Sequence, residues 1–232
     1  GNGVITLIRK GPNIDRPIAE ITSNWPAVDV TVFAELEAPS PEGIRKIQRP
    51  EMIAPLIVRP SPEGRFGNFQ HWIQSAADLL ILNPFAETLM LVEDEAMITH
   101  GIREQVEDVL FPVNCGVVSL YCPYLTPYIR RKGFQKTSVW NRWHGLAGAL
   151  AFVFPRSVLA DLTQRKSIAG WVGPKGQLIP HPGYPWLRKG IDYWVGRELS
   201  QMRLDAWHFN PSFVCHNHPH PENSTLGHSH PR

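Results

Sequence analysis

Three consecutive carboxylates, Glu93, Asp94 and Glu95, follow directly after the apolar run at residues 88–92. A buried strand that ends in carboxylates concentrates negative charge at one point, and ligands of open α/β sheets bind at the carboxyl ends of the strands. Carboxylate oxygens are suitable ligands for Mg²⁺ and Mn²⁺. The triplet therefore predicts a site for a divalent cation, and the alternative is a solvated acidic turn.

A second group of potential metal ligands lies near the C-terminus, where histidines are concentrated. The apolar pair Phe213 and Val214 predicts a short strand that ends in His216, and such a strand can place this imidazole beside the acidic triplet. Four later histidines fit either an ordered segment or a disordered tail that binds zinc adventitiously: His218, His220, His228 and His230.

The composition is typical of a soluble globular protein. Of the 232 residues, 43% are hydrophobic and 19% are charged, so the chain can bury a full core. The formal net charge is +2 and the basic residues are scattered, which does not indicate nucleic-acid binding. No run approaches the ~20 apolar residues of a transmembrane segment. Three cysteines do not make a disulfide framework, so we expect a reducing, cytoplasmic location, with a membrane-peripheral one left open.

Apolar patterning predicts alternating strands and helices. We expect strands at residues 4–8, 28–33, 88–92, 116–120 and 149–154, and helices at residues 14–24, 68–82, 155–162 and 190–202. The Pro- and Gly-rich segments 38–62 and 170–190 are expected to be loops over the site. This order predicts an α/β fold, with a mixed, mostly parallel, Rossmann-like sheet flanked by helices. We expect one domain over residues 1–232.

Several short motifs occur in an order that resembles the GT-A fold glycosyltransferases. They are the Gly-Arg-Phe-Gly-Asn turn before the helix at residue 68, the strand that ends in Glu-Asp-Glu, the Gly-Ile-Asp-Tyr-Trp segment at residue 190, and the ending Pro-Ser-Phe-Val-Cys-His followed by Asn-Ser-Thr-Leu-Gly. The chain is most similar in these features to the group around N-acetylglucosaminyltransferase IV and its bacterial relatives. The resemblance covers residues 4 to about 228.

The resemblance implies a site for a nucleotide-sugar donor, which in this family points to a UDP-sugar. Residues 1 to about 120 would form the donor half and the remainder the acceptor half. The residues that would contact the nucleotide, the diphosphate or the donor sugar are Thr6, Arg9, Glu35, Arg65, Asn68, Glu93, Asp94, Ser224 and Thr225. The last two belong to a C-terminal segment that would fold over the donor as a lid.

The resemblance also implies a metal ion and a catalytic base. Mn²⁺ or Mg²⁺ would be held by Glu95 and His216 and would neutralise the diphosphate. The family pattern has Asp where this chain has Glu95, which is one methylene longer. Asp192 matches the position where inverting members keep the base that removes the acceptor proton. The structural alternative for Asp192 is a cap of the following helix.

The function expected from the sequence is metal-dependent, inverting transfer of a sugar from a nucleotide diphosphate to an acceptor hydroxyl. Two alternatives stay open: a metal-dependent hydrolase or phosphoesterase, and a non-catalytic carbohydrate- or metal-binding module. Four tryptophans in loop-like or boundary segments are suited to stacking on sugar rings: Trp140, Trp143, Trp171 and Trp186. Three others are expected in the core: Trp72, Trp194 and Trp207.

Overall fold

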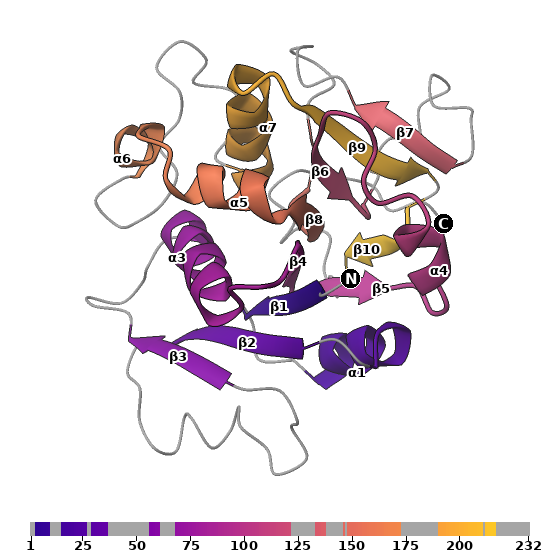
Figure 1. The fold of residues 1–232 in the computed structure, drawn as a ribbon. Coiled ribbons are helices and arrows are strands. Elements are labelled where there is room, and N and C mark those ends of the chain that lie inside the picture. The colour runs from indigo at the N-terminus through magenta and orange to yellow at the C-terminus, as the bar shows by residue number, and fades with distance from the viewer. Residues whose placement is uncertain are drawn as a thin grey trace.

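A computed structural model describes residues 3–9, 15–26, 29–36, 56–60, 68–121, 133–137, 146, 148–172, 190–210 and 212–216. In parts of the strands and at a few helix ends it describes the backbone alone. The elements discussed below, and the contacts between them, are those of these residues (Figure 1).

The centre of the fold is an eight-stranded sheet with the strand order β3-β2-β1-β4-β8-β6-β9-β7. Its strands are β1 (Gly3–Arg9), β2 (Asp29–Leu36), β3 (Leu56–Pro60), β4 (Thr88–Glu93), β6 (Cys115–Ser119), β7 (Gly133–Thr137), β8 (Ala151–Pro155) and β9 (Asp205–Asn210). Of these, β1 to β4, β6 and β9 run in one direction, and β7 and β8 run in the other. The predicted α/β fold with a mixed, mostly parallel sheet is confirmed.

Helices cover both faces of this sheet (Figure 1). One face carries α3 (Asn68–Leu82), α5 (Arg156–Thr163) and α7 (Ile191–Gln201), with the short α6 (Ser167–Trp171) beside them. The other face carries α1 (Asp15–Asn24), α4 (Arg103–Glu107) and a small second sheet made of β5 (Ala96–Ile98) and β10 (Val214–His216). The sheet thus separates two hydrophobic cores.

Strand β4 is buried on both faces because its side chains alternate between these two cores. Leu89 and Leu91 pack in the core under α3, α5 and α7, whereas Met90 and Val92 pack in the core under α1 and the small sheet. All four are at most 4% exposed. A central strand that is buried on both faces has a continuous apolar run, which makes it detectable in the sequence.

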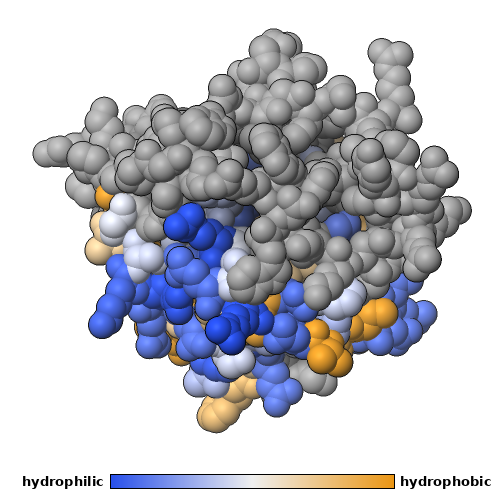
Figure 2. Space-filling model, turned by 90° about the horizontal axis from the view of Figure 1, so that it is seen from above, coloured by the Kyte–Doolittle hydropathy of each residue, from blue (hydrophilic) through white to orange (hydrophobic). Residues whose placement is uncertain are grey.

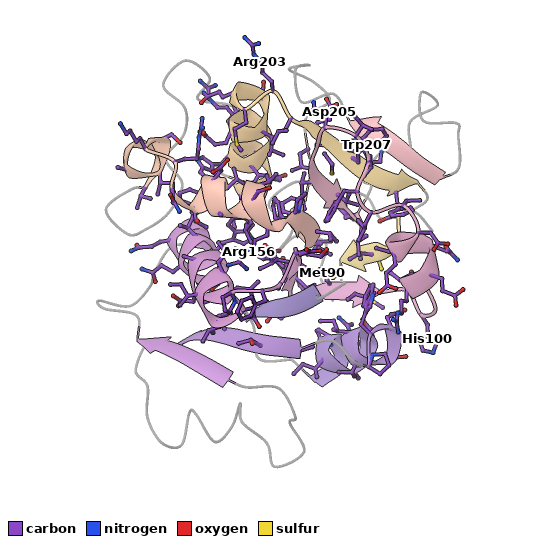
Figure 3. The ribbon with its side chains drawn as sticks, viewed as in Figure 1. Met90, His100, Arg156, Arg203, Asp205 and Trp207 are labelled. Carbon is purple, nitrogen blue, oxygen red and sulfur yellow. The ribbon has the colours of Figure 1, made fainter. Side chains whose placement is uncertain are left out.

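The end of α3 is fixed by a side chain from α5. The Arg156 guanidinium donates to the carbonyl oxygens of Leu80, Asn83 and Ala86 at 2.9, 2.6 and 3.2 Å. It therefore satisfies carbonyl groups that have no partner within the helix. Figure 3 shows Arg156 between α5 and α3.

The face seen in Figure 2 is mainly hydrophilic where its residues are described. In the view of Figure 2, blue residues dominate the coloured part of the face, and orange residues occur there in small separate groups. The large hydrophobic residues that are exposed in the described part of the chain include Ile81, Leu82 and Phe85, at and just after the end of α3.

The predicted helices and strands agree with the structure to within a few residues, and three expectations need correction. The segment 38–62 is not wholly a loop, because β3 lies within it and pairs with β2 at the sheet edge. The segment 170–190 begins inside α6, which includes Trp171, so this residue ends a helix. Trp72 and Trp194 are fully buried as expected, whereas Trp207 is only partly buried against the core under α1.

Candidate active site

The carboxyl ends of the parallel strands bring several of the predicted residues to one edge of the sheet. Arg9 ends β1, and Glu35 is the penultimate residue of β2. Glu93 ends β4 and lies opposite Ile8 of β1. Thr6 lies in the middle of β1, three positions before its end. Ligands of open α/β sheets bind at this edge.

Glu93 and Asp94 are buried at the point where β4 leaves the sheet, with exposures of 4% and 6%. The Glu93 N–H donates to the Leu150 carbonyl at 2.9 Å, which extends the β4–β8 pairing by one residue. Asp94 and Glu95 then form the turn into β5, where Glu95 is half-buried. Burying carboxylates costs free energy unless charge or hydrogen bonds compensate them. The expectation of a merely solvated acidic turn is therefore wrong for Glu93 and Asp94.

Asp192 lies in the first turn of α7, with its carboxylate turned back over Gly190. A Cβ added at Gly190 would overlap this carboxylate, so a larger residue is excluded there without a shift. Gly190 is the N-cap residue and is extended (φ −98°, ψ 141°), so Asp192 is not the N-cap residue itself. Its carboxylate interacts with the first-turn N–H groups of Asp192 and Tyr193, so the capping alternative stays open. The carboxylate also reaches beyond the start of the helix, as the next contact shows.

A backbone group from a distant segment holds the Asp192 carboxylate. The Gly148 N–H donates to its Oδ2 at 2.7 Å. Gly148 has a positive φ of 75°, and a Cβ there would overlap the ring of Tyr121. Only glycine fits this combination of backbone conformation and close packing without strain. The Tyr121 ring therefore packs against Gly148, whose N–H holds the Asp192 carboxylate.

The pKa of Asp192 is raised above the ordinary value of an aspartate. Burial is the largest cause, and the negative charge of Glu93 adds to it. The backbone N–H groups of Gly148, Tyr193 and Asp192 itself oppose the rise. The influence of Glu93 means that α7 and the end of β4 bring two carboxylates, one from each predicted half of the chain, within electrostatic range.

The strand predicted to end in His216 is present and lies beside the acidic turn. In β10, His216 is the register partner of Ala96, which directly follows Glu95. The Phe213 N–H donates to the Leu120 carbonyl at 2.9 Å, which ties this strand to the end of β6. The backbone therefore brings positions 95 and 216 together, while the His216 side chain lies outside the described residues.

Several predicted site residues lie outside the described part of the chain. These are Arg65, Ser224, Thr225, the tryptophans 140, 143 and 186, and the histidines after His216, together with the side chains of Thr6, Arg9, Glu35 and Asn68. Among the described side chains, no group of three or more His, Cys, Asp or Glu residues is arranged to hold a metal ion. The metal site stays a prediction that depends on His216.

The contacts that hold the Asp192 carboxylate are not evident in the sequence. Gly148 directly precedes the strand expected at residues 149–154, and nothing in the sequence pattern distinguishes Tyr121. His208 on β9 is also not evident: it lies opposite Ser119 of β6, and burial lowers its pKa to about 4. A signal for Gly148 does exist, since a glycine just before a buried strand often marks a positive φ or a close backbone approach.

Comparison with known proteins finds similarity among solved structures alone. No protein-family model and no curated protein matches the sequence. Among solved structures, the chain is similar to the inositol-1-phosphate CTP transferase from T. maritima, with a TM-score of 0.46 and 11% sequence identity over 90% of this chain and 86% of that chain. No helix in the described part of the chain is long and apolar enough to span a membrane.

Proposed function

We propose that this protein is a metal-dependent, inverting glycosyltransferase that moves a sugar from a nucleotide diphosphate to an acceptor hydroxyl. One observation supports the proposal most. Asp192 is held by the Gly148 N–H at the sheet edge where parallel strands end, within electrostatic range of Glu93 at the end of β4. A single displacement needs a base close to the bound donor and acceptor, and the position of Asp192 near a carboxylate predicted to bind the donor supports that role.

The residues around the acidic turn fit a divalent cation. Two buried carboxylates, Glu93 and Asp94, precede Glu95, and the backbone of His216 lies next to this turn. Oxygen ligands with one imidazole suit Mn²⁺ or Mg²⁺, and excess negative charge in a partly buried site favours a cation. Glu95 and His216 would hold the ion. When bound, it supplies charge neutralisation for the departing diphosphate.

Asp192 is suited to remove the acceptor proton. Its raised pKa brings it closer to neutral pH, where a general base is more effective. In the transfer step the acceptor oxygen bonds to the anomeric carbon, and its hydroxyl proton passes to the Asp192 carboxylate. The bond between the anomeric carbon and the diphosphate oxygen breaks, and its electron pair leaves with the diphosphate. Configuration at the anomeric carbon is inverted, because one displacement occurs from the opposite face.

The remaining predicted residues have donor-binding roles in this proposal. Arg9 and Glu35 lie at the ends of neighbouring parallel strands and would line the nucleotide pocket, with Thr6 deeper in β1. Asn68 begins α3, and the N-terminus of a helix offers N–H groups to an anion or a sugar hydroxyl. Arg65, Ser224 and Thr225 would complete the donor contacts from outside the described residues.

Thermal unfolding with nucleotide and metal tests this function. UDP and Mn²⁺ together should raise Tm more than the sum of their separate effects, because both bind the native state and each supports the other. CDP, GDP and ADP with Mn²⁺ establish the base preference. The absence of a shift with all four nucleotides would contradict the proposal. Release of free sugar or phosphate without any acceptor would favour the hydrolase alternative.

A further inference from the structure

Strand β5, which follows the acidic turn, pairs with β10 along one edge and contacts side chains of α1 along the other. On the first edge, β10 pairs with β5 and places Cys215 opposite Met97. The Thr99 N–H donates to the Phe213 carbonyl at 2.8 Å on the same edge. In an antiparallel pair, alternate residues direct their backbone groups to opposite edges. The backbone groups of Ala96 and Ile98 therefore point away from β10.

Side chains of α1 meet these outward groups. Glu20 Oε2 accepts the Ile98 N–H at 2.7 Å, and Arg16 Nη2 donates to the Ala96 carbonyl at 3.3 Å. The two side chains also form an ion pair at 3.3 Å, and Arg16 and Glu20 are only 28% and 23% exposed. Arg16 and Glu20 together thus take the place of a neighbouring strand on this edge.

Asn24 continues the same contact at the end of α1. Its Nδ2 donates to the Thr99 carbonyl at 3.1 Å, and its Oδ1 accepts the Ile102 N–H at 3.0 Å. Ser23 contacts His100 at 2.8 Å beside it, and Figure 3 shows His100 next to α1. The polar side of α1 is therefore matched to the backbone that leaves the acidic turn, over residues 96–102.

We infer that Arg16 and Glu20 are positioning residues for the proposed metal ligand Glu95. Ala96 follows Glu95 directly, so the bond from Arg16 to the Ala96 carbonyl restricts the Ala96–Met97 peptide, which is the next peptide after the one that joins Glu95 to β5. His216 lies across from Ala96 on the other edge. Glu95 directly precedes β5 and His216 pairs with β5. Because α1 contacts the opposite edge of β5, it restricts the positions of both proposed ligands. This inference rests on the proposed function, because it assumes that Glu95 binds the donor metal.

The experiment measures metal and nucleotide affinity separately in two variants, Glu20→Ala and Arg16→Ala. The Kd for Mn²⁺ in the presence of saturating UDP should rise about tenfold in each, as for other residues that orient metal ligands. The Kd for UDP without metal should stay within about twofold of wild type, because neither residue contacts the nucleotide in this proposal. Glu20→Gln keeps an oxygen that can accept the Ile98 N–H, so it should restore most of the Mn²⁺ affinity lost in Glu20→Ala.

Thr22→Ala is the matched control on the same helix, because the Thr22 hydroxyl bonds only the Ile18 and Ala19 carbonyls of α1 among the described groups. It should leave the Kd for Mn²⁺ unchanged. Unchanged Mn²⁺ affinity in both alanine variants would overturn this inference alone. The inference also fails if Tm and UDP affinity fall in parallel with Mn²⁺ affinity, since that indicates a general structural role.

Wild-type protein that binds neither UDP nor Mn²⁺ would overturn the proposed function and this inference with it. If Glu20→Ala does not fold, Arg16→Ala decides, because it removes the longer bond and leaves Glu20 on the Ile98 N–H. Hydrogen exchange of the segment 94–98 gives a second readout. Exchange should quicken there in Arg16→Ala while α3 and α5 keep wild-type protection.

Discussion

Helix α7 carries two carboxylates in very different surroundings. Glu198, on the side facing α6, is fully buried and accepts bonds from Arg165 Nε and Ser167 Oγ, both at 2.7 Å. Asp192, in the first turn, accepts the Gly148 N–H and lies under the influence of Glu93. No lysine, arginine or histidine in the described part of the chain forms an ion pair with Asp192.

In the proposed function, this difference separates a structural carboxylate from one that takes part in the chemistry. A buried carboxylate with a cation and a hydroxyl donor around it has its charge compensated within the native structure. A buried carboxylate that is influenced by another carboxylate and forms no ion pair is less stable when ionised, which leaves it able to take up a proton. On α7, Glu198 is the carboxylate whose charge is compensated, and Asp192 is the one that can take up a proton.

The largest effect that we predict is on transfer activity in Asp192→Asn. Loss of a general base should lower kcat by about 10²–10⁴-fold. The stabilising effect of UDP with Mn²⁺ should persist, because the amide keeps the size of the side chain and an oxygen for the Gly148 N–H. Activity within a few-fold of wild type would exclude Asp192 as the base.

The same variant should be at least as stable as wild type at neutral pH. A pKa that is raised in the folded state means that stability is fully present below the ordinary aspartate pKa and is lost as pH rises through the folded value. The advantage of Asp192→Asn should therefore be greatest at neutral pH and shrink toward acidic pH. Denaturant unfolding at several pH values measures this difference.

Glu198→Gln should have the opposite effect. The protein should be less stable, and its transfer activity should be retained. The substitution removes the charge partner of Arg165, whose side chain is 31% exposed, so we expect a loss of about 2 kcal/mol in the free energy of unfolding. Glu107→Gln is the control, since the Arg103–Glu107 pair is 48% and 46% exposed and is worth at most about 0.5 kcal/mol. Equal losses in the two variants would remove the contrast between the two carboxylates of α7.

The elements that can be predicted from the sequence are those with strong local patterns. The run before Glu93 is continuously apolar from Leu89 to Val92 because β4 is buried on both faces. By contrast, β9 contains His208 and Asp205 among its apolar residues, and it is held by pairing with β6 and β7 from distant parts of the chain. Such pairing leaves little local signal.

In the candidate site, too, some residues can be predicted from the sequence and others cannot. Glu93 has a local context, because it ends an apolar strand, whereas Asp192 is predicted only by the resemblance to the GT-A fold glycosyltransferases. The contact between Gly148 and Asp192 spans 44 positions and depends on a positive φ, which the sequence shows only as one glycine among many. The contacts that Arg16 and Glu20 of α1 make with β5 are likewise not evident in the sequence, because these two residues have the spacing of an ordinary i,i+4 surface pair.

A smaller effect is expected from Gly148→Ala, which tests whether the support of Asp192 matters. The left-handed conformation costs a non-glycine residue about 1–2 kcal/mol, and the new Cβ would displace Tyr121 or the Gly148 peptide. Gly101→Ala is a close control, because Gly101 has a similar φ of 72° and no atom within 4 Å of its Cβ position. Both variants should lose stability, but only Gly148→Ala should lose activity beyond that loss. Equal activity in the two would mean that Gly148 has no part in placing Asp192.

The smallest effect concerns pH, and it tests directly whether the charge of Glu93 influences the pKa of Asp192. Glu93→Gln removes a negative charge that raises the pKa of Asp192, so that pKa should fall, though not to its ordinary value, because burial is the larger cause. The acidic limb of the profile of kcat against pH should therefore move to lower pH, whatever happens to kcat itself. Glu107→Gln, on the exposed surface of α4, should leave the limb where it is in wild type. An unmoved limb in Glu93→Gln would mean that Glu93 does not influence the base, and the distinction between the two carboxylates of α7 would then rest on burial and on the Arg165 ion pair.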